Sequence, residues 1–512
     1  MSHKPHLTLH LLIASALLGV AGLLAGPSPA SAQTKAITVV LDDDPPNLDV
    51  CEMSRSYNGR IVRFNIGETL TQINRETGKL DPRLATSWER IDEKTWRFQL
   101  VRNAKFHDGS PFNADAVVKS LDRTFHNVPK LFCGNEAKAA APSIKGKVVD
   151  EFTIDISLDR PAPVLPVTMN IIGIASPKAS REKLEGVAVG TGPYKMVSRT
   201  TSEIILERNP DYWGPMPGVE RARFVWRSES SVRAAMVAIG EADIASNISS
   251  QEATNPDTDF PYLNSESTRL RFEMDAPPQN DIRIRKALHY ALDRNAMKGT
   301  VFSKDAVIAT HIFEANIQGH NGDLKPWPYD PQKAKQLIAE AKADGVPVDR
   351  EMTVICRPQQ WPGSQEAMET AMGYFKAVGF NVKIRCMEPK EHTDMNTKPF
   401  DPNRGPILFQ DQHDNANGDP VFSALTKYGC AGVQSTLCDK KLDALFDEAA
   451  ALVSGPQRIE AWKKAFGYLY TEVVPDALFF NMTGYTRVNK RVKFKPTIET
   501  NFSIDLSKVS FN

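Results

Sequence analysis

The chain has 512 residues, of which 62 are Lys or Arg and 62 are Asp or Glu, so its formal net charge at pH 7 is zero. The basic residues are dispersed along the chain. This argues against a nucleic-acid partner, because nucleic-acid binding requires a concentrated positive face. The length exceeds that of one ordinary hydrophobic core and predicts two or three lobes.

Residues 1–32 are expected to form a cleavable secretory signal peptide. The basic start MSHKPHLTLH is followed by the apolar run LLIASALLGVAGLLAG and the small-residue segment PSPASAQ, which predicts cleavage before Gln33. The apolar run is shorter than the ~20 residues that a membrane-spanning helix needs. Gln33, and not a cysteine, stands directly after the cleavage point, so we expect the mature chain to be exported from the cytoplasm without a lipid anchor.

Strand and helix signals alternate in the first half of the mature chain. Residues 35–49 predict a strand that breaks at a Pro-Pro pair. Residues 95–106 alternate apolar and polar side chains, which is the period of a half-buried strand. Asn113 then stands where the N-cap of a helix is expected, and residues 152–161 predict another strand that a proline ends.

The second half of the chain is also mixed. Residues 280–302 predict one amphipathic helix, capped near its first residue. Residues 330–345 predict a helix with an aspartate cap, a proline at the first helical position and a glycine at the end. Residues 352–386 read as strand, helix and strand, a βαβ unit with parallel strands. Two further amphipathic helices are predicted at 439–452 and 456–473.

The six cysteines are an even number in a chain that is predicted to be exported, which favours disulfides. They are Cys51, Cys133, Cys356, Cys386, Cys430 and Cys438. The last two close the short loop CAGVQSTLC, and the middle two end strand-like runs on either side of a helix. The first two remain as the third pair. A zinc site would need close C-x-x-C pairs, which this sequence lacks.

Two short motifs are expected to be structural. FHDG, residues 106–109, contains an Asp-Gly turn between a strand and a helix cap. GTGPY, residues 190–194, continues into a proline and a strand, whereas a phosphate-binding loop continues into a helix. A basic cluster on the 280–302 helix is expected on its solvated face: Arg283, Arg285, Lys286 and Arg294. The common hydrolase, metalloprotease and nucleotide-binding signatures are absent from the sequence.

Four blocks of the sequence, in order, carry a resemblance to a known family. The first is LDPRLATSWERIDEKTWRFQLVRNAKFHDGSPFNADAVVKSLDR, residues 80–123. The others are VGTGPYKMVSRTTSEIILERNPDYWG (189–214), DIRIRKALHYALDRNAMKGTVF (281–302) and YDPQKAKQLIAEA (329–341). Together they resemble the periplasmic solute-binding proteins of ABC importers, family 5, the branch that takes up oligopeptides, dipeptides and nickel. The resemblance runs over essentially the whole mature chain.

The resemblance implies an α/β protein with the two-lobed periplasmic-binding-protein fold of type II, in the large three-subdomain cluster, with mixed sheets and two hinge-crossing strands. Lobe I would comprise residues 33–275 with 486–512 returning to it, and lobe II residues 276–485. The strand-like runs at 268–277 and 477–488 fit the two crossings. Hinge closure around a solute is the expected motion.

The resemblance also implies a receptor and not an enzyme, with no cofactor and no resident metal. It would capture a short peptide or a peptide-like small organic solute between the lobes and deliver it to an inner-membrane ABC permease with its ATPase. We expect a monomer in the periplasm with no nucleic-acid partner. The alternative within the family is a nickel or metal-chelate solute. A secreted hydrolase is the less favoured alternative, and a chemosensory role is compatible with the same fold.

The stretch FQDQHDNANGDP, residues 409–420, concentrates polar candidates for the solute site. It follows the βαβ unit and precedes a helix, so we expect it at the carboxyl end of a strand, where α/β sheets bind ligands. Its candidate residues are Asp411, His413, Asp414, Asn417 and Asp419. Asp419 precedes a proline and is equally consistent with a turn or a helix cap.

In the peptide-binding branch the matching segment reads like GDNGDPDNF, and its first aspartate takes the α-ammonium group of the peptide. Ala416 stands at that place here. Asp414 or Asp411 is expected to substitute, because an ammonium group in a closed cleft needs a close carboxylate partner. For the metal alternative, His413 with these two aspartates would be the ligands, since imidazole and carboxylate suit divalent metals.

Four further residues are candidates by their position. Arg357 is expected to bind a carboxylate of the solute through its guanidinium group. Trp361 would stack on a flat or apolar group of the solute, or pack within the lobe. Arg55 and Tyr57 lie in a segment that reaches the cleft in relatives. A hydrolase would need a nucleophile, a base and an orienting group, and no motif supplies them.

Overall fold

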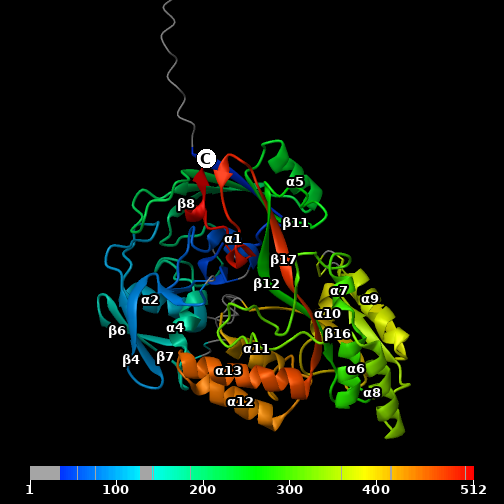
Figure 1. Ribbon diagram of the computed structural model, residues 1–512. Helices are drawn as coiled ribbons and strands as arrows, with labels where there is room; N and C mark the ends of the chain where they lie inside the picture. The colour runs from blue at the N-terminus through cyan, green and yellow to red at the C-terminus, as the bar shows by residue number, and fades with distance from the viewer. Residues whose placement is uncertain are drawn as a thin grey trace, which may run out of the picture. The chain divides into compact units, whose positions relative to one another are not determined.

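The main feature of the computed structural model is an eleven-stranded mixed sheet (Figure 1). Its order is β15 (Val382–Cys386), β14 (Met352–Cys356), β16 (Ile407–Asp414), β12 (Asp259–Phe272), β17 (Asp476–Val488), β11 (Ile244–Ile248), β1 (Ala36–Leu41), β10 (Arg221–Trp226), β9 (Glu203–Arg208) and β8 (Tyr194–Arg199), with β13 (Val307–Ile308) paired to β17. The structure describes residues 35–54, 56–74, 77–126, 141, 143–184, 186–358, 360–361, 363–415, 418–501 and 503–512.

Two long antiparallel strands occupy the middle of this sheet. β12 has 14 residues and β17 has 13. Figure 1 shows them side by side, β12 in green and β17 in orange-red. The first part of β12 pairs only with β17, whereas its last seven residues pair with β16 as well. The predicted run at 477–488 lies within β17, whereas the run at 268–277 overlaps β12 only as far as Phe272. The prediction of a two-lobed fold with mixed sheets is confirmed.

Smaller sheets flank the main one. The strands β4 (Ala85–Arg90), β5 (Thr95–Leu100), β7 (Thr153–Ser157) and β6 (Lys145–Asp150) form an antiparallel sheet in that order. Two short pairs join β2 (Thr71–Ile73) to β3 (Leu80–Pro82) and β18 (Val492–Lys493) to β19 (Ser510–Phe511). The four-stranded sheet encloses a core of its own around Phe98. Other cores surround Val39 of β1 and Val354 of β14.

The helices fill the connections between these strands. Those discussed below are α1 (Ser56–Val62), α2 (Ala114–Leu121), α6 (Ile282–Ala291), α7 (Arg294–Met297), α8 (Pro331–Ala343), α9 (Ser364–Ala377), α11 (Pro420–Lys427), α12 (Lys440–Ala451) and α13 (Pro456–Tyr468). The others are α4 (Leu165–Thr168), α5 (Ser230–Ala238) and α10 (Pro389–Met395). None of the helices in the described part of the chain combines the length and apolar composition needed to cross a membrane.

Side-chain caps place several helix starts where the sequence predicted them. Asn113 caps α2 by accepting from the Ala116 N–H, and Asp330 caps α8 by accepting from the Lys333 N–H. The single helix predicted over residues 280–302 is wrong in its second half. α6 ends at Ala291, and Asp293 then caps the short α7, because its carboxylate accepts from the backbone at the start of a new turn.

The βαβ unit and two of the disulfides agree with the sequence. β14 and β15 run parallel with Cys356 opposite Cys386, and these two cysteines are joined. Cys430 and Cys438 close the short loop. Cys51 is also disulfide-bonded. The predicted partner of Cys51, Cys133, lies outside the described residues.

The FHDG and GTGPY motifs lie against each other. The His107 N–H donates to the Gly190 carbonyl over 2.9 Å, and the His107 Nε2 lies 2.9 Å from the Gly192 carbonyl oxygen. Burial lowers the pKa of His107 to about 4, so its ring is neutral. A Cβ atom at Gly190 would lie 2.1 Å from the Ile66 carbonyl oxygen, which explains the glycine. The contacts give both motifs a structural role.

Two members of the basic cluster on the 280–302 segment are buried. Arg285 is 6% exposed and donates to the carbonyl of Val473, and Arg294 is 4% exposed and donates to the carbonyl of Leu478. The expectation that these two side chains face solvent is therefore wrong. Backbone carbonyls from distant segments accept their hydrogen bonds, and local periodicity does not reveal such partners.

We predict that Gly190→Ala lowers the free energy of unfolding by about 1–3 kcal/mol, because the new methyl group would force the packed backbone of residue 66 to move. The measurement is denaturant unfolding of the mature protein. Gly186→Ala is the matched control, since a Cβ atom there meets nothing within 4 Å. Equal stability of both variants would contradict the packing role of Gly190.

Candidate functional site

The predicted stretch at residues 409–420 begins in strand β16 and ends in helix α11. The structure does not describe Ala416 or the candidate Asn417, which lie between these elements. Successive side chains of a strand point to opposite faces of the sheet. The register of β16 against β12 places Asp411 opposite Arg269 and Asp414 opposite Glu266. Asp411 and His413 therefore share one face, and Asp414 lies on the other with Gln410 and Gln412.

The first face carries a buried ion network, which we define as Arg269, Asp411, Lys427 and Asp476. Asp411 accepts from Arg269 Nε at 3.0 Å and Nη2 at 2.7 Å, and from Lys427 Nζ at 2.8 Å. Arg269 Nη1 also donates to Asp476 Oδ2, which accepts from the Tyr428 hydroxyl at 2.6 Å. All five side chains are at most 5% exposed. The ion network therefore ties β12, β16, β17 and α11 together.

Within the ion network, each charged group changes the pKa of its neighbours. Burial alone would raise the pKa of Asp411, but Lys427 and Arg269 hold it well below its usual value. Burial lowers the pKa of Lys427 to about 8, although Asp411 opposes this change. The carboxylate of Asp411 is thus occupied by three charge-assisted hydrogen bonds inside the protein.

His413 and Asp419 are also engaged within the protein. His413 is 4% exposed, and its Nε2 lies 2.7 Å from Ser423 Oγ. Burial holds the pKa of this imidazole well below its usual range, so the ring is neutral. Asp419 caps α11 by accepting from the Val421 N–H at 2.9 Å, and both of its oxygens accept from Arg458. The structure thus uses Asp419 as a helix cap.

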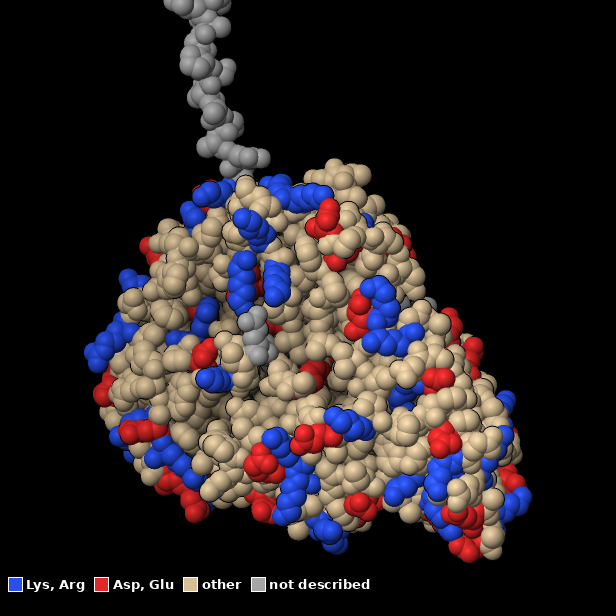
Figure 2. Space-filling view, in the orientation of Figure 1, with Lys and Arg blue, Asp and Glu red and all other residues tan. Residues whose placement is uncertain are grey.

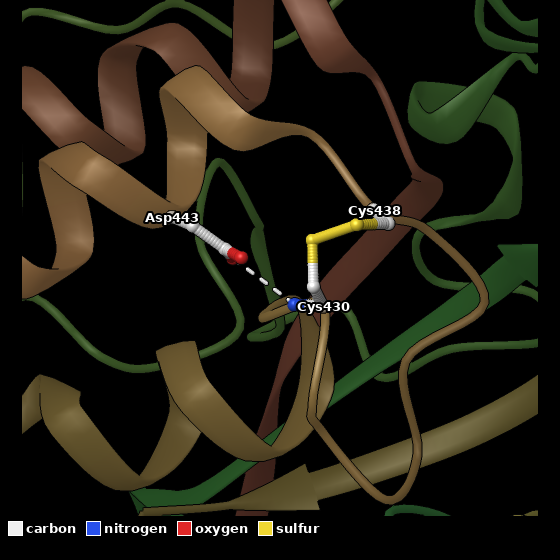
Figure 3. Close-up of side chains that lie close together, drawn as sticks. All are labelled: Cys430, Cys438 and Asp443. Carbon is white, nitrogen blue, oxygen red and sulfur yellow. Dashed lines mark hydrogen bonds between the residues drawn. A yellow bond between two sulfur atoms is a disulfide. The ribbon is translucent and has the colours of Figure 1, made fainter.

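The residues suggested for a metal site do not form one donor set. Asp414 lies on the opposite face of β16 from Asp411 and His413. Metal ligands in proteins are mostly His, Cys, Asp and Glu side chains. Within the described ranges, the only group of three such residues with ligand atoms within 4.8 Å of one another is Cys430, Cys438 and Asp443. Figure 3 shows that the two sulfur atoms form a disulfide and that Asp443 accepts from the Cys430 N–H, at 3.0 Å. This carboxylate therefore holds the disulfide loop against α12.

The second face of β16 carries what we call the polar wall: Glu266, Gln412, Asp414, Gln410 and Gln360, with the backbone of Arg357 at one end. Gln412 Nε2 donates to Glu266 Oε2, and Ser265 Oγ lies 3.4 Å from Asp414 Oδ1. Gln410 donates to Gln360 at 3.0 Å and accepts from the Arg357 N–H at 2.9 Å. Gln410 and Asp414 are four positions apart, which is about 13 Å along a strand. The carboxylates of Glu266 and Asp414 therefore lie at one end of the polar wall, and the backbone of Arg357 lies at the other.

Arg357 meets the polar wall through its backbone N–H, which donates to Gln410. It is half-buried, and its Nε is shielded from solvent without a hydrogen-bond partner among the described residues. A buried unpaired donor is costly, so this atom is suited to receive an external acceptor. Guanidinium binds carboxylates in a planar, bidentate manner. The geometry is therefore compatible with the role that the sequence predicted for Arg357.

Glu266 is the feature of this site that the sequence analysis missed. Its side chain is partly exposed and lies among neutral donors, Gln412, Asn264 and Asn501. Burial raises its pKa to about 7, and Arg60 and the amide donors only partly oppose this change. A strand-like run with a glutamate carries no local signal for this role, because its partners come from β16 and from residues near the C-terminus.

The remaining candidates from the sequence are Trp361, Arg55 and Tyr57. Trp361 is 6% exposed and stacks on Phe302, with ring centroids 6.0 Å apart, inside the core around β14. This arrangement matches the packing alternative for Trp361. Arg55 and the side chain of Tyr57 lie outside the described part of the chain. On the face shown in Figure 2, basic and acidic side chains are interspersed, in keeping with the zero net charge.

The architecture is the two-lobed fold of the type II periplasmic binding proteins. The structure superposes on HbpA2 from Haemophilus parasuis with a TM-score of 0.80, at 22% identity, over 93% of this chain and 100% of the other. Residues 79–432 match the model of the bacterial extracellular solute-binding proteins, family 5. This match covers more than half of the chain, and the protein belongs to that family of binding proteins.

Two relatives match over most of their length. The dipeptide-binding protein of Escherichia coli K12 is 28% identical over 480 residues, which cover 85% of each chain. The heme-binding protein A of Haemophilus influenzae is 26% identical over 476 residues, which cover 86% of this chain and 84% of the relative. Both relatives are similar to this chain along nearly its whole length.

We predict that Asp411→Asn lowers the free energy of unfolding by about 3–5 kcal/mol, because it leaves Arg269 and Lys427 buried without their shared counter-charge. Denaturant unfolding at pH 7 measures this loss. Asp414→Asn on the same strand is the control and should cost less than about 1 kcal/mol, since Asp414 is partly exposed. A stable Asp411→Asn variant would show that the ion network does not hold the strands.

Proposed function

We propose that this protein is a monomeric, non-catalytic periplasmic receptor that captures a peptide or peptide-like solute between its lobes. Lobe I would comprise residues 33–275 and 486–512, and lobe II residues 276–485. The receptor would hand the solute to an inner-membrane ABC permease with its ATPase. Cleavage of residues 1–32 would release it into the periplasm without a lipid anchor.

One observation supports the proposal for the solute: the backbone of Arg357 contacts Gln410, which lies about 13 Å along β16 from Asp414 and its cross-strand neighbour Glu266. An elongated solute with an anionic group at one end and a cationic group at the other would satisfy both ends. A short peptide has this charge pattern. The similarity to a dipeptide-binding protein supports the same class of solute.

The roles within the site follow from the two faces of β16. Arg357 would bind the carboxylate of the solute, and Asp414 with Glu266 would face its ammonium group in place of the aspartate missing at Ala416. The role of three other candidates would be structural: Asp411 and His413 would stabilise β16, and Asp419 would stabilise the start of α11. The solute would stabilise the closed state, because only that state contacts it from both lobes.

We predict that a panel of dipeptides and tripeptides contains a solute that stabilises the mature protein in a thermal-shift assay. At 100 times its dissociation constant, a solute adds about 2.7 kcal/mol to the free energy of unfolding. Arg357→Gln should abolish the shift, whereas Arg350→Gln should preserve it, since Arg350 is exposed and donates to a backbone carbonyl.

The same assay separates the alternatives. A shift with nickel, ferric chelates or hemin, and none with any peptide, would overturn the proposed solute class. Release of free amino acids from the peptides would overturn the proposal that the protein is not catalytic. Equal loss of the shift in both arginine variants would remove Arg357 from the site.

A further inference from the structure

The disulfide between Cys430 and Cys438 (Figure 3) lies at the surface of the protein, beside a cavity. Cys438 is exposed and Cys430 is half-buried. The cavity has a volume of about 430 Å³, and both cysteines line it. A disulfide reacts only with a thiolate that can reach one of its sulfur atoms, so access contributes strongly to the rate of exchange. The position of this disulfide therefore leaves it open to small thiols.

The cavity carries charged side chains of both signs. These are Arg285, Lys398, Asp275, Asp439 and Glu472. Lys398 Nζ donates to the Cys430 carbonyl at 3.1 Å, so a cation stands beside the disulfide and favours an incoming thiolate. Asp443 has the opposite effect, because its carboxylate lies within 4.8 Å of both sulfur atoms and keeps a freed sulfur in its thiol form.

The disulfide between Cys356 and Cys386 is protected by comparison. Cys356 is fully buried, and Cys386 is partly buried and packs against the core around β14. The two cysteines end neighbouring parallel strands, β14 and β15, whose backbones are paired up to these residues. A thiol would reach these sulfur atoms only after the edge of the sheet had opened. The two disulfides should therefore differ in reactivity within the same folded protein.

The loop between Cys430 and Cys438 is also attached to the protein by contacts that do not involve sulfur. The Gln434 carbonyl accepts from Arg271 Nη1 at 2.9 Å, and Thr436 Oγ1 donates to the Phe272 carbonyl at 2.6 Å. The Gln434 N–H donates to the Thr426 carbonyl at 3.1 Å. These bonds fasten the loop to β12 and α11. The loop should therefore stay in place when the bond between the sulfur atoms breaks.

We propose that the Cys430–Cys438 disulfide is a thiol-exchange site, which low-molecular-weight thiols open without unfolding the protein. A thiolate attacks Cys438 Sγ and forms a mixed disulfide there, while Cys430 leaves and takes up a proton. A second thiolate attacks the sulfur of the bound small thiol, and Cys438 leaves and is protonated in turn. Two small thiols are thereby oxidised to one disulfide, and the protein disulfide is reduced to two thiols. The site couples this surface to the thiol–disulfide balance of the surroundings.

The test is a time course of the native mature protein with 2-mercaptoethanol, quenched with acid and followed by alkylation and mass mapping of the peptides. Cys430 and Cys438 should be reduced about tenfold faster than Cys356 and Cys386, because access differs. A mercaptoethanol adduct should appear on Cys438, and the far-UV circular dichroism should not change. The same time course in denaturant is the control, in which the difference between the two disulfides should disappear.

Equal rates for the two disulfides in the native protein would overturn the exchange site, and this measurement needs no variant. An adduct confined to Cys430 would overturn the proposed direction of attack, and loss of the circular dichroism signal would overturn exchange without unfolding. A double variant, Cys430→Ser with Cys438→Ser, should lose the fast reaction, and its persistence would also overturn the site. The inference depends on neither the solute nor the lobe boundaries, so a failed peptide panel is a separate result.

Discussion

The arrangement of the site depends on the buried ion network centred on Arg269. From β12, this single guanidinium binds Asp411 of β16 and Asp476 of β17, so it joins three neighbouring strands across the middle of the main sheet. Removing one partner of such a group leaves an uncompensated buried charge. Because side chains alternate along a strand, fixing Asp411 on one face turns Gln412 and Asp414 towards the other. The ion network thus sets which side chains can meet a solute.

Much of the fold could be predicted from local patterns. The βαβ unit and two helix caps follow from strand-like and helix-like runs and from short polar residues before apolar runs. The two crossing strands were expected from the resemblance to the family. The break between α6 and α7 could not be predicted, because Asp293, the N-cap of α7, lies within a run of residues with helical periodicity. The burial of Arg285 and Arg294 in these helices could not be predicted either, because backbone carbonyls in or near β17 accept their hydrogen bonds.

The sequence predicted only part of the candidate site. The polar stretch after the βαβ unit indicated β16 as the strand of the proposed site, but its residue types could not reveal that Asp411 and His413 face the ion network. That division depends on pairing with β12, a strand that lies far away in the chain. Glu266 was missed for the same reason, since its partner Gln412 is 146 residues away. Composition identifies a polar strand, but the register of the sheet determines which side chains of that strand lie on each face.

The measurement that tests the account most directly is a crystal structure of the mature protein with the peptide that stabilises it most. The account predicts an intact peptide enclosed between the lobes along the outward-facing residues of β16, with its carboxylate on Arg357 and its ammonium group near Glu266 and Asp414. A peptide bound elsewhere, bound in the opposite direction or found cleaved would contradict it.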